Sequence, residues 1–261
     1  MNENDMQQYI LKRYGDIRNT DGIRAYYDYS DYLNLGYWDE HTRDQKKACE
    51  NMMEMLMAFL PEKKGRILDI ACGKGATTAY LQNYYPVGDI MGIDMSAKQI
   101  EVAQANAPGC TFMQMSATDL SFADESFDSV ISVEAAFHFN TREDFLKEAC
   151  RVLKSGGYLV LSDILMTLEG ERQVESRSEK NFIANLEEYR VILERTGFKV
   201  VQIVDATENC WRQHFRHVVQ YVHEKFLNRE ITRQELEKHL YYTYRRALYV
   251  EFYLLAAARK I

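Results

Sequence analysis

The fold is decided by Ile67-Leu-Asp-Ile-Ala-Cys-Gly-Lys-Gly-Ala-Thr-Thr78, a short apolar run that enters a glycine-containing turn and continues into residues suited to a helix. Such a run predicts a buried strand, a tight loop and a helix amino terminus. Glycine lets the backbone approach a ligand closely, and the first N–H groups of a helix are unpaired. The stretch therefore predicts a ligand-binding loop at the edge of a parallel sheet.

Around this stretch, short apolar runs alternate with amphipathic segments, which is typical of β-α-β units. Strands are expected at residues 66–71, 90–94, 110–115, 128–133, 157–163, 199–204 and about 249–257. Helices are expected at residues 76–85, 97–106, 142–154 and 185–196. The predicted fold class is α/β, a Rossmann-like fold with a mainly parallel seven-stranded sheet. Residues 1–60 predict a helical amino-terminal cap, residues 61–261 the domain that holds the sheet, and residues 205–245 a helical insertion, all in one structural domain.

Composition excludes several classes of partner. The chain has 261 residues, with 32 Lys and Arg against 39 Asp and Glu, and its formal charge of −7 argues against binding to nucleic acid. Five cysteines without a C-x-x-C pair suggest free thiols in a reducing compartment. The polar start lacks the pattern of a signal peptide, and no apolar run reaches the length of a membrane span. We expect a cytoplasmic protein without a membrane span; the sequence does not indicate its oligomeric state.

A second acidic residue identifies the kind of ligand. Asp94 ends the next predicted strand, nineteen residues after Gly75, where a carboxylate can accept hydrogen bonds from ribose hydroxyls. A dinucleotide fingerprint would need glycine at Thr78, and no phosphate P-loop is present. Asp69, just before the turn, would repel a pyrophosphate but suits an ammonium group. S-adenosylmethionine carries such a group, so it is the predicted cofactor, with S-adenosylhomocysteine as product.

These motifs resemble those of the class I S-adenosylmethionine-dependent methyltransferases, over roughly residues 25–205 and at the last strand. The first family motif, an acid followed by spaced glycines, is matched with alanine in place of the first glycine. The ribose acid, the adenine segment near residue 116 and the end of the fourth strand are also similar. The resemblance implies that the cofactor is bound by Asp69, Ala71, Gly73, Gly75, Asp94, Met95, Gln99, Ser116, Ala117 and Glu134.

A second resemblance concerns Tyr27-Asp-Tyr-Ser-Asp-Tyr-Leu-Asn-Leu-Gly-Tyr-Trp38. It is similar to an amino-terminal segment of small-molecule methyltransferases, including natural-product sugar O-methyltransferases and enzymes acting on tocopherols and sterols. The resemblance implies that Tyr27, Tyr37 and Trp38 close over the methionine end of the cofactor. The alternative for Tyr37 and Trp38 is a buried staple between helix and loop.

Two residues are candidates for acid–base chemistry. His138 follows the fourth predicted strand and Asp163 ends the fifth, and the sugar O-methyltransferases resemble this arrangement. An ordinary histidine titrates near pH 6.5, which suits a general base for a hydroxyl. The alternatives are a histidine that caps the strand end and an aspartate that caps a loop or helix. His214, His217 and His223 more closely fit a solvated helical face, so no metal is predicted.

The predicted reaction is transfer of a methyl group from S-adenosylmethionine to a hydroxyl oxygen of a small, partly apolar natural product. C- or N-methylation is the alternative within the same branch. A non-catalytic S-adenosylmethionine-binding protein and an NAD-dependent oxidoreductase are remoter alternatives. Seven of the 18 tyrosines lie within residues 1–40 and six within residues 221–253. Because tyrosine combines an apolar ring with a hydroxyl, we expect these clusters to line the acceptor cavity.

Overall fold

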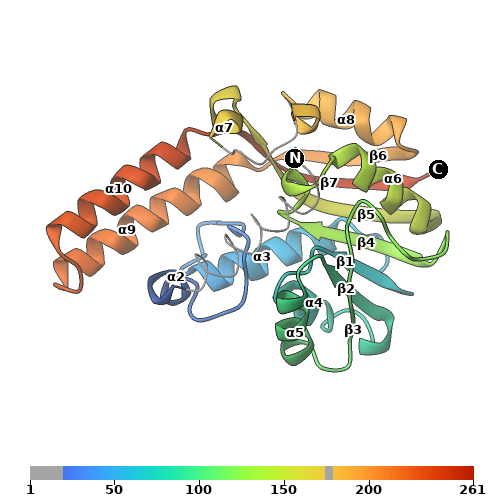
Figure 1. Ribbon diagram of the computed structural model, residues 1–261, viewed down its shortest axis with the longest axis horizontal. Helices are drawn as coiled ribbons and strands as arrows, with labels where there is room; N and C mark the ends of the chain where they lie inside the picture. The colour runs from blue at the N-terminus through green and yellow to red at the C-terminus, as the bar shows by residue number, and fades with distance from the viewer. Residues whose placement is uncertain (1–19, 174–178) are drawn as a thin grey trace.

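A seven-stranded sheet forms the centre of the computed structural model, which describes residues 20–173 and 179–261 (Figure 1). The spatial order of the strands is β3-β2-β1-β4-β5-β7-β6, and only β7 runs antiparallel to its neighbours. The strands are β1 (Ile67–Ile70), β2 (Ile90–Asp94), β3 (Thr111–Gln114), β4 (Phe127–Val133), β5 (Leu153–Met166), β6 (Phe198–Asp205) and β7 (Val250–Lys260). The predicted α/β fold with a mainly parallel sheet is confirmed.

Helices flank this sheet and extend beyond it. The α-helices of the described residues are α2 (Asp21–Tyr26), α3 (Gln45–Ala58), α4 (Ala76–Leu81), α5 (Ala97–Asn106), α6 (Arg142–Val152), α7 (Leu168–Arg172), α8 (Leu186–Arg195), α9 (Gln213–Leu227) and α10 (Arg233–Ala247). Short helical turns are η2 (Val87–Asp89), η3 (Ala136–His138), η4 (Glu179–Asn181) and the π-helical η5 (Thr207–Arg212). The expected helix at residues 97–106 has its predicted bounds.

Two elements differ from their predicted bounds by four residues at one end. The helix expected at residues 76–85 ends at Leu81, and residues 82–84 continue as turns whose amides bond three residues back. Pro86 follows these turns, and a proline disfavours helical backbone at the residue before it. β5 begins at Leu153 rather than 157, because Leu153 already pairs with Phe127 ahead of an irregularity in register.

The sheet separates two hydrophobic cores. Successive side chains of a strand point to opposite faces, so Leu159 and Leu161 of β5 join one core while Val160 and Ile164 join the other. Helices α6 and α8 cover the first core, and α3, α4 and η5 cover the second. Both faces of the central strands are therefore buried, which explains their continuous apolar sequences.

The described part of the predicted cap packs directly on the second core. Asp44 begins α3 by accepting a hydrogen bond from the amide of Lys47, and α3 buries Met52, Met53 and Leu56 against the sheet. Between α2 and α3 the chain has little regular structure, and we call its residues 31–35 the strap. The division of the chain at residue 60 stays a prediction.

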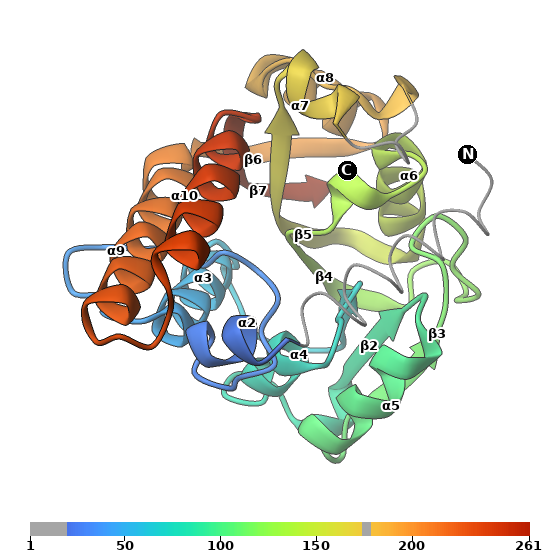
Figure 2. The same cartoon turned by 60° about the vertical axis from the view of Figure 1, so that its left-hand side comes forward.

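The insertion between β6 and β7 contains η5, α9 and α10, as predicted. Helices α9 and α10 lie side by side as a hairpin that extends away from the sheet (Figures 1 and 2). Thr232 and Glu235 start α10 with a capping box, in which each side chain bonds the other's backbone amide. None of the helices in the described ranges has both the length and the apolar composition needed to cross a membrane.

Candidate active site

A cavity of about 230 Å³ opens where β1, β2 and β4 end. One side is formed by the strap, and the floor by the loop between β1 and α4. The predicted site residues that line it are Ala71, Gly73, Asp94, Met95, Gln99, Ser116, Ala117, Glu134 and His138. Tyr27, Tyr37, Trp38, Asp69, Gly75 and Asp163 do not line it. The structure thus brings residues from five segments of the sequence to one edge of the sheet.

The loop after β1 uses left-handed backbone at three positions. The φ angles of Ala71, Gly73 and Gly75 are +61°, +54° and +80°. A Cβ atom on Gly75 would lie 2.8 Å from Ala103, and one on Gly73 would lie 3.0 Å from Leu33 of the strap. Glycine at position 75 is therefore required for the close approach of this loop to α5, whereas the contact at position 73 is with the end of the flexible Leu33 side chain. Ala71 adopts the same backbone region at a steric cost.

Asp69 lies beneath this loop rather than in the cavity. Its Oδ2 accepts hydrogen bonds from the hydroxyls of Thr77 and Thr78, both at 2.7 Å, which fastens the start of α4 to the end of β1. Burial raises the pKa of Asp69 to about 6, although the two hydroxyl bonds act in the opposite direction. Asp69 does not line the cavity, and its contact with the ammonium group of the cofactor stays a prediction.

Asp94 lines the cavity and has the geometry expected of a ribose acceptor. Oδ1 accepts from the amide of Ser96 at 2.9 Å and Oδ2 from the amide of Gly73 at 3.1 Å. Each carboxylate oxygen can accept more than one hydrogen bond, so both remain able to receive a hydroxyl. Burial raises the pKa of Asp94 to about 6, against the effect of the two amides. The residues present therefore fit a nucleoside.

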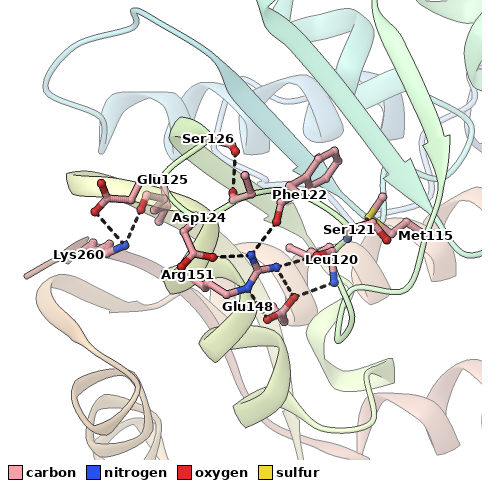
Figure 3. A network of polar contacts seen from close by, with 12 residues as sticks. Met115, Leu120, Ser121, Phe122, Asp124, Glu125, Ser126, Glu148, Arg151 and Lys260 are labelled. Carbon is pink, nitrogen blue, oxygen red and sulfur yellow. Dashed lines mark hydrogen bonds and ion pairs between the residues drawn. The ribbon is translucent and has the colours of Figure 1, made fainter.

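The loop that follows β3 supplies the wall next to Asp94. Ser116, Ala117, Thr118 and Asp119 line the cavity. Behind them, Arg151 of α6 donates to the carbonyls of Leu120 and Phe122, both at 2.7 Å (Figure 3). Glu148 accepts from Arg151 and from the amide of Leu120. This network holds the loop against α6.

The strap supplies residues that the sequence analysis missed. Asp31, Tyr32, Leu33 and Asn34 line the cavity. Asp31 forms an ion pair with Lys74 of the glycine-containing loop, with Oδ1 and Nζ 3.0 Å apart, and accepts from Asn106 at 2.8 Å. The acidic and aromatic pattern of residues 27–38 pointed to this segment, but its spacing did not show which side chains face the ligand.

The aromatic residues expected to close over the cofactor pack elsewhere. Trp38 stacks on His217 with ring centroids 3.9 Å apart, and its Nε1 donates to the carbonyl of Leu35. Tyr37 packs against the second core, and Tyr27 is buried with its ring edge-on to Tyr26. The staple alternative therefore describes the contacts of Tyr37 and Trp38.

Glu134, at the end of β4, joins the strap to β7. Its Oε2 accepts from the amide of Leu35 at 2.7 Å and from the hydroxyl of Tyr253 at 2.8 Å. Its backbone has φ +52°, and its amide donates to Ser162 of β5. Tyr253 lies 119 positions away in the sequence, and nothing in the sequence pattern connected the two residues.

His138 and Asp163 are separated. His138 belongs to η3, is buried and lines the cavity. The fully buried Asp163 instead forms an ion pair with Arg142, with Nε and Oδ2 2.6 Å apart. Successive residues of a strand face opposite ways: Ser162 bonds Glu134 beside the cavity, so Asp163 points toward the start of α6. The sequence analysis expected Asp163 to reach the cavity and hold the imidazole, but in the structure Asp163 pairs with Arg142 instead.

The sequence analysis also interpreted three histidines as a solvated helical face and predicted no metal. His214 is buried and bonds Gln45, His217 stacks on Trp38, and the exposed His223 bonds the carbonyl of Val219. The expected solvated face is therefore wrong for His214. No cluster of three or more potential metal ligands occurs among residues 20–173 and 179–261.

The expectation that the tyrosine clusters line the cavity is wrong for most of the tyrosines that the structure describes. Of these, Tyr32 lines it, whereas Tyr241, Tyr242 and Tyr244 on α10 are half exposed or more. The hairpin explains the difference, because its outer face points away from the sheet (Figure 2). Tyr9 and Tyr14 lie outside the described residues.

The strand order and the acid at the end of β2 define the class, an α/β protein that binds a nucleoside-containing cofactor. Residues 68–161 match the sequence profile of a family described as a methyltransferase domain. Over 213 residues the chain is 30% identical to O-methyltransferase resE of Aspergillus sclerotiorum, covering 76% of this chain and 78% of that protein. The chain therefore belongs to the class I S-adenosylmethionine-dependent small-molecule methyltransferases.

Two further comparisons agree with this family. The chain is 30% identical over 192 residues to 27-O-demethylrifamycin SV methyltransferase of Amycolatopsis mediterranei, covering 67% of this chain and 70% of that protein. The fold is similar to geranyl diphosphate C-methyltransferase from Streptomyces coelicolor, solved with Mg²⁺, geranyl diphosphate and S-adenosyl-L-homocysteine. That comparison has a TM-score of 0.70 at 17% identity and covers 100% of both chains. The protein is thus an enzyme whose cofactor is S-adenosylmethionine.

Proposed function

We propose that this enzyme transfers a methyl group to a hydroxyl oxygen of a small, partly apolar natural product, with His138 as the general base. The observation that carries the proposal is the position of His138, which lines the same cavity as Asp94 and the glycine-containing loop. The names of the two relatives, both described as acting at oxygen, support the choice of a hydroxyl.

The cofactor supplies a methyl group activated by a sulfonium. Asp94 would accept hydrogen bonds from ribose hydroxyls, and Ser116 with the backbone of Ala117 would contact the adenine. Val133, Ala135 and Phe139 line the cavity near His138 and would contact apolar parts of the acceptor. The imidazole of His138 would take the proton of the hydroxyl as the oxygen–carbon bond forms, which contributes typically about 10²- to 10⁴-fold to such a reaction.

N-methylation is the second candidate, because Glu134 also lines the cavity and a carboxylate suits an amine acceptor. C-methylation stays an alternative of the same branch. We further propose that the acceptor is a metabolite rather than nucleic acid and that the enzyme works in the cytoplasm. The net charge of −7 and the five cysteines support these two points.

The test is incubation of the enzyme with methyl-labelled S-adenosylmethionine and a metabolite extract, followed by identification of the labelled product. A product labelled at oxygen, with turnover strongly reduced in His138→Ala, supports the proposal. A product labelled at nitrogen or carbon would reject O-methylation and establish N- or C-methylation instead. If His138→Ala turns over the true acceptor at the wild-type rate, the role of His138 is rejected. The turnover of Asp163→Asn, measured in the same assay, tests whether Asp163 takes part in the reaction.

A further inference from the structure

We infer that Asn181 is a positioning residue for His138 and acts by tying together both ends of the loop that forms the acceptor wall. We call His138, Phe139 and Asn140 the acceptor wall, because all three line the cavity after β4. The inference rests on the proposed function, since it concerns the histidine that the proposal makes the general base.

The side chain of Asn181 spans the two ends of this wall. Its Oδ1 accepts from the amide of Arg142 at 2.6 Å, two residues after the wall, and its Nδ2 donates to the carbonyl of Phe137 at 3.4 Å, directly before it. Asn181 is only 4% exposed and does not line the cavity. One buried amide group therefore links the backbone on both sides of His138, Phe139 and Asn140.

Arg142 and Asp163 hold this amide in place. The guanidinium of Arg142 donates to the carbonyl of Asn181, to the carbonyl of Ile164 at 2.7 Å and to Asp163 at 2.6 Å. All these groups are buried, so water cannot replace a lost partner and each contact fixes the next. Asp163, which the sequence suggested as a partner of the imidazole, is linked to the ends of the acceptor wall through Arg142 and Asn181.

The consequence is that a side chain outside the cavity sets the position of the imidazole inside it. A general base has to lie within hydrogen-bond reach of the proton that it takes. A displacement of about 1 Å can lower a rate by roughly 100-fold, even when its cause lies away from the reacting atoms. Loss of the Asn181 amide should therefore disturb His138 while leaving the cofactor contacts of Asp94 intact.

The experiment records the imidazole NMR signals of the full chain with S-adenosylhomocysteine bound, and assigns His138 from its missing signal in His138→Gln. Asn181→Ala removes both links, whereas Asn181→Asp keeps an acceptor for the amide of Arg142 and removes only the donor to Phe137. Asn228→Ala, at an exposed asparagine on the hairpin, is the matched control. No acceptor is needed, so the result does not depend on finding the methylated product.

Both Asn181 variants should shift the His138 signal and leave that of the exposed His41 in place, while the dissociation constant of S-adenosylhomocysteine stays within about twofold. The control variant should move neither signal. With the acceptor of the functional test, kcat should fall about 10-fold or more and the KM for S-adenosylmethionine should not change. An unmoved His138 signal in a folded Asn181→Asp protein overturns the inference, even if its thermal stability has dropped.

Discussion

Each end of helix α6 supports a different wall of the cavity. An arginine makes the contacts at each end, and the two arginines differ in their surroundings. Arg142, the first residue of the helix, is 2% exposed and lies among Asp163, Asn181 and Ile164 behind the acceptor wall. Arg151, in the last turn, has a side chain that is 30% exposed and bonds loop carbonyls and Glu148 (Figure 3). It lies behind the part of the cavity that we call the cofactor wall, which consists of Asp94, Ser116, Ala117, Thr118 and Asp119. The acceptor wall therefore depends on a buried network, and the cofactor wall on one that solvent and salt can weaken.

The largest expected effect is on the buried network. Arg142→Met removes the partner of the fully buried Asp163 and leaves an uncompensated charge, so the free energy of unfolding should fall by about 3–5 kcal/mol. Urea denaturation measures the loss. The double variant Arg142→Met with Asp163→Leu should recover most of it, because no charge is then left unpaired. Equal losses in the single and double variants would show that the ion pair is not the reason.

On the cofactor wall, Asp94→Asn should weaken binding of S-adenosylhomocysteine by about 10- to 100-fold, since hydrogen bonds to a charged group contribute roughly 1.5–3 kcal/mol. Burial places the pKa of Asp94 at about 6, above the ordinary 3.8, so the folded state favours the protonated form. The stability that protonation provides is lost as the pH rises from about 4 to 6.

Ribose hydroxyls should bind best to the ionised carboxylate, so wild-type affinity should rise between pH 5 and 7. Calorimetry over this range tests the point. The Asn variant should show a flatter profile. Its thermal stability at pH 7 should fall somewhat, because Nδ2 cannot accept the amide hydrogen bond that one carboxylate oxygen accepts in the wild type. Burial chiefly raises the pKa of Asp69 as well, and the charge of Asp94 adds to this, so the pKa of Asp69 should fall in the variant. An equally steep profile in the variant would assign the pH dependence to another group.

Loss of the more exposed arginine should cost less. Arg151→Met should lower the free energy of unfolding by about 1 kcal/mol, since partly exposed ion pairs contribute little, and 1 M salt should reduce the difference from wild type. The matched control is Arg233→Met, whose exposed pair with Glu237 holds no loop. Cofactor affinity should fall in the Arg151 variant and not in the control. A loss as large as that of Arg142→Met would abolish the contrast between the two ends of α6.

The smallest effect is expected at Ala71. Its φ of +61° is strained for an L-residue, and glycine relieves this strain at the cost of a more flexible unfolded chain. Ala71→Gly should therefore change the free energy of unfolding by no more than about 1 kcal/mol, in the stabilising direction. A clear destabilisation, measured by urea denaturation, would show that the methyl group of Ala71 makes a packing contact worth more than the strain.

The two walls also differ in how far the sequence predicts them. Ala71, Gly73, Asp94 and Ser116 follow the ends of β1, β2 and β3, and ends of adjacent parallel strands meet at one edge. Local pattern was therefore enough to predict that they line one cavity. It also predicted which segments form the seven strands and the insertion before β7, because the periodicity of each segment is strong, whereas the spatial order of the strands came from the structure alone.

Residues that depend on distant partners could not be predicted in this way. The bonds of Asn181 to Phe137 and Arg142, and of Tyr253 to Glu134, join segments that only the folded chain brings together. Asp163 was expected to end the fifth strand, but β5 continues to Met166. Asp163 therefore lies within the strand and points to the face opposite Ser162, and the sequence pattern did not show where the strand ends.

The central claim is that one cavity holds the cofactor and, opposite it, His138 as the base. Its most direct test is to compare His138→Gln with wild type, using labelled S-adenosylmethionine and the acceptor identified from the extract. The account predicts that kcat falls by about 10²- to 10⁴-fold, while the dissociation constant of S-adenosylmethionine stays within about twofold. Unchanged turnover in the variant would contradict it.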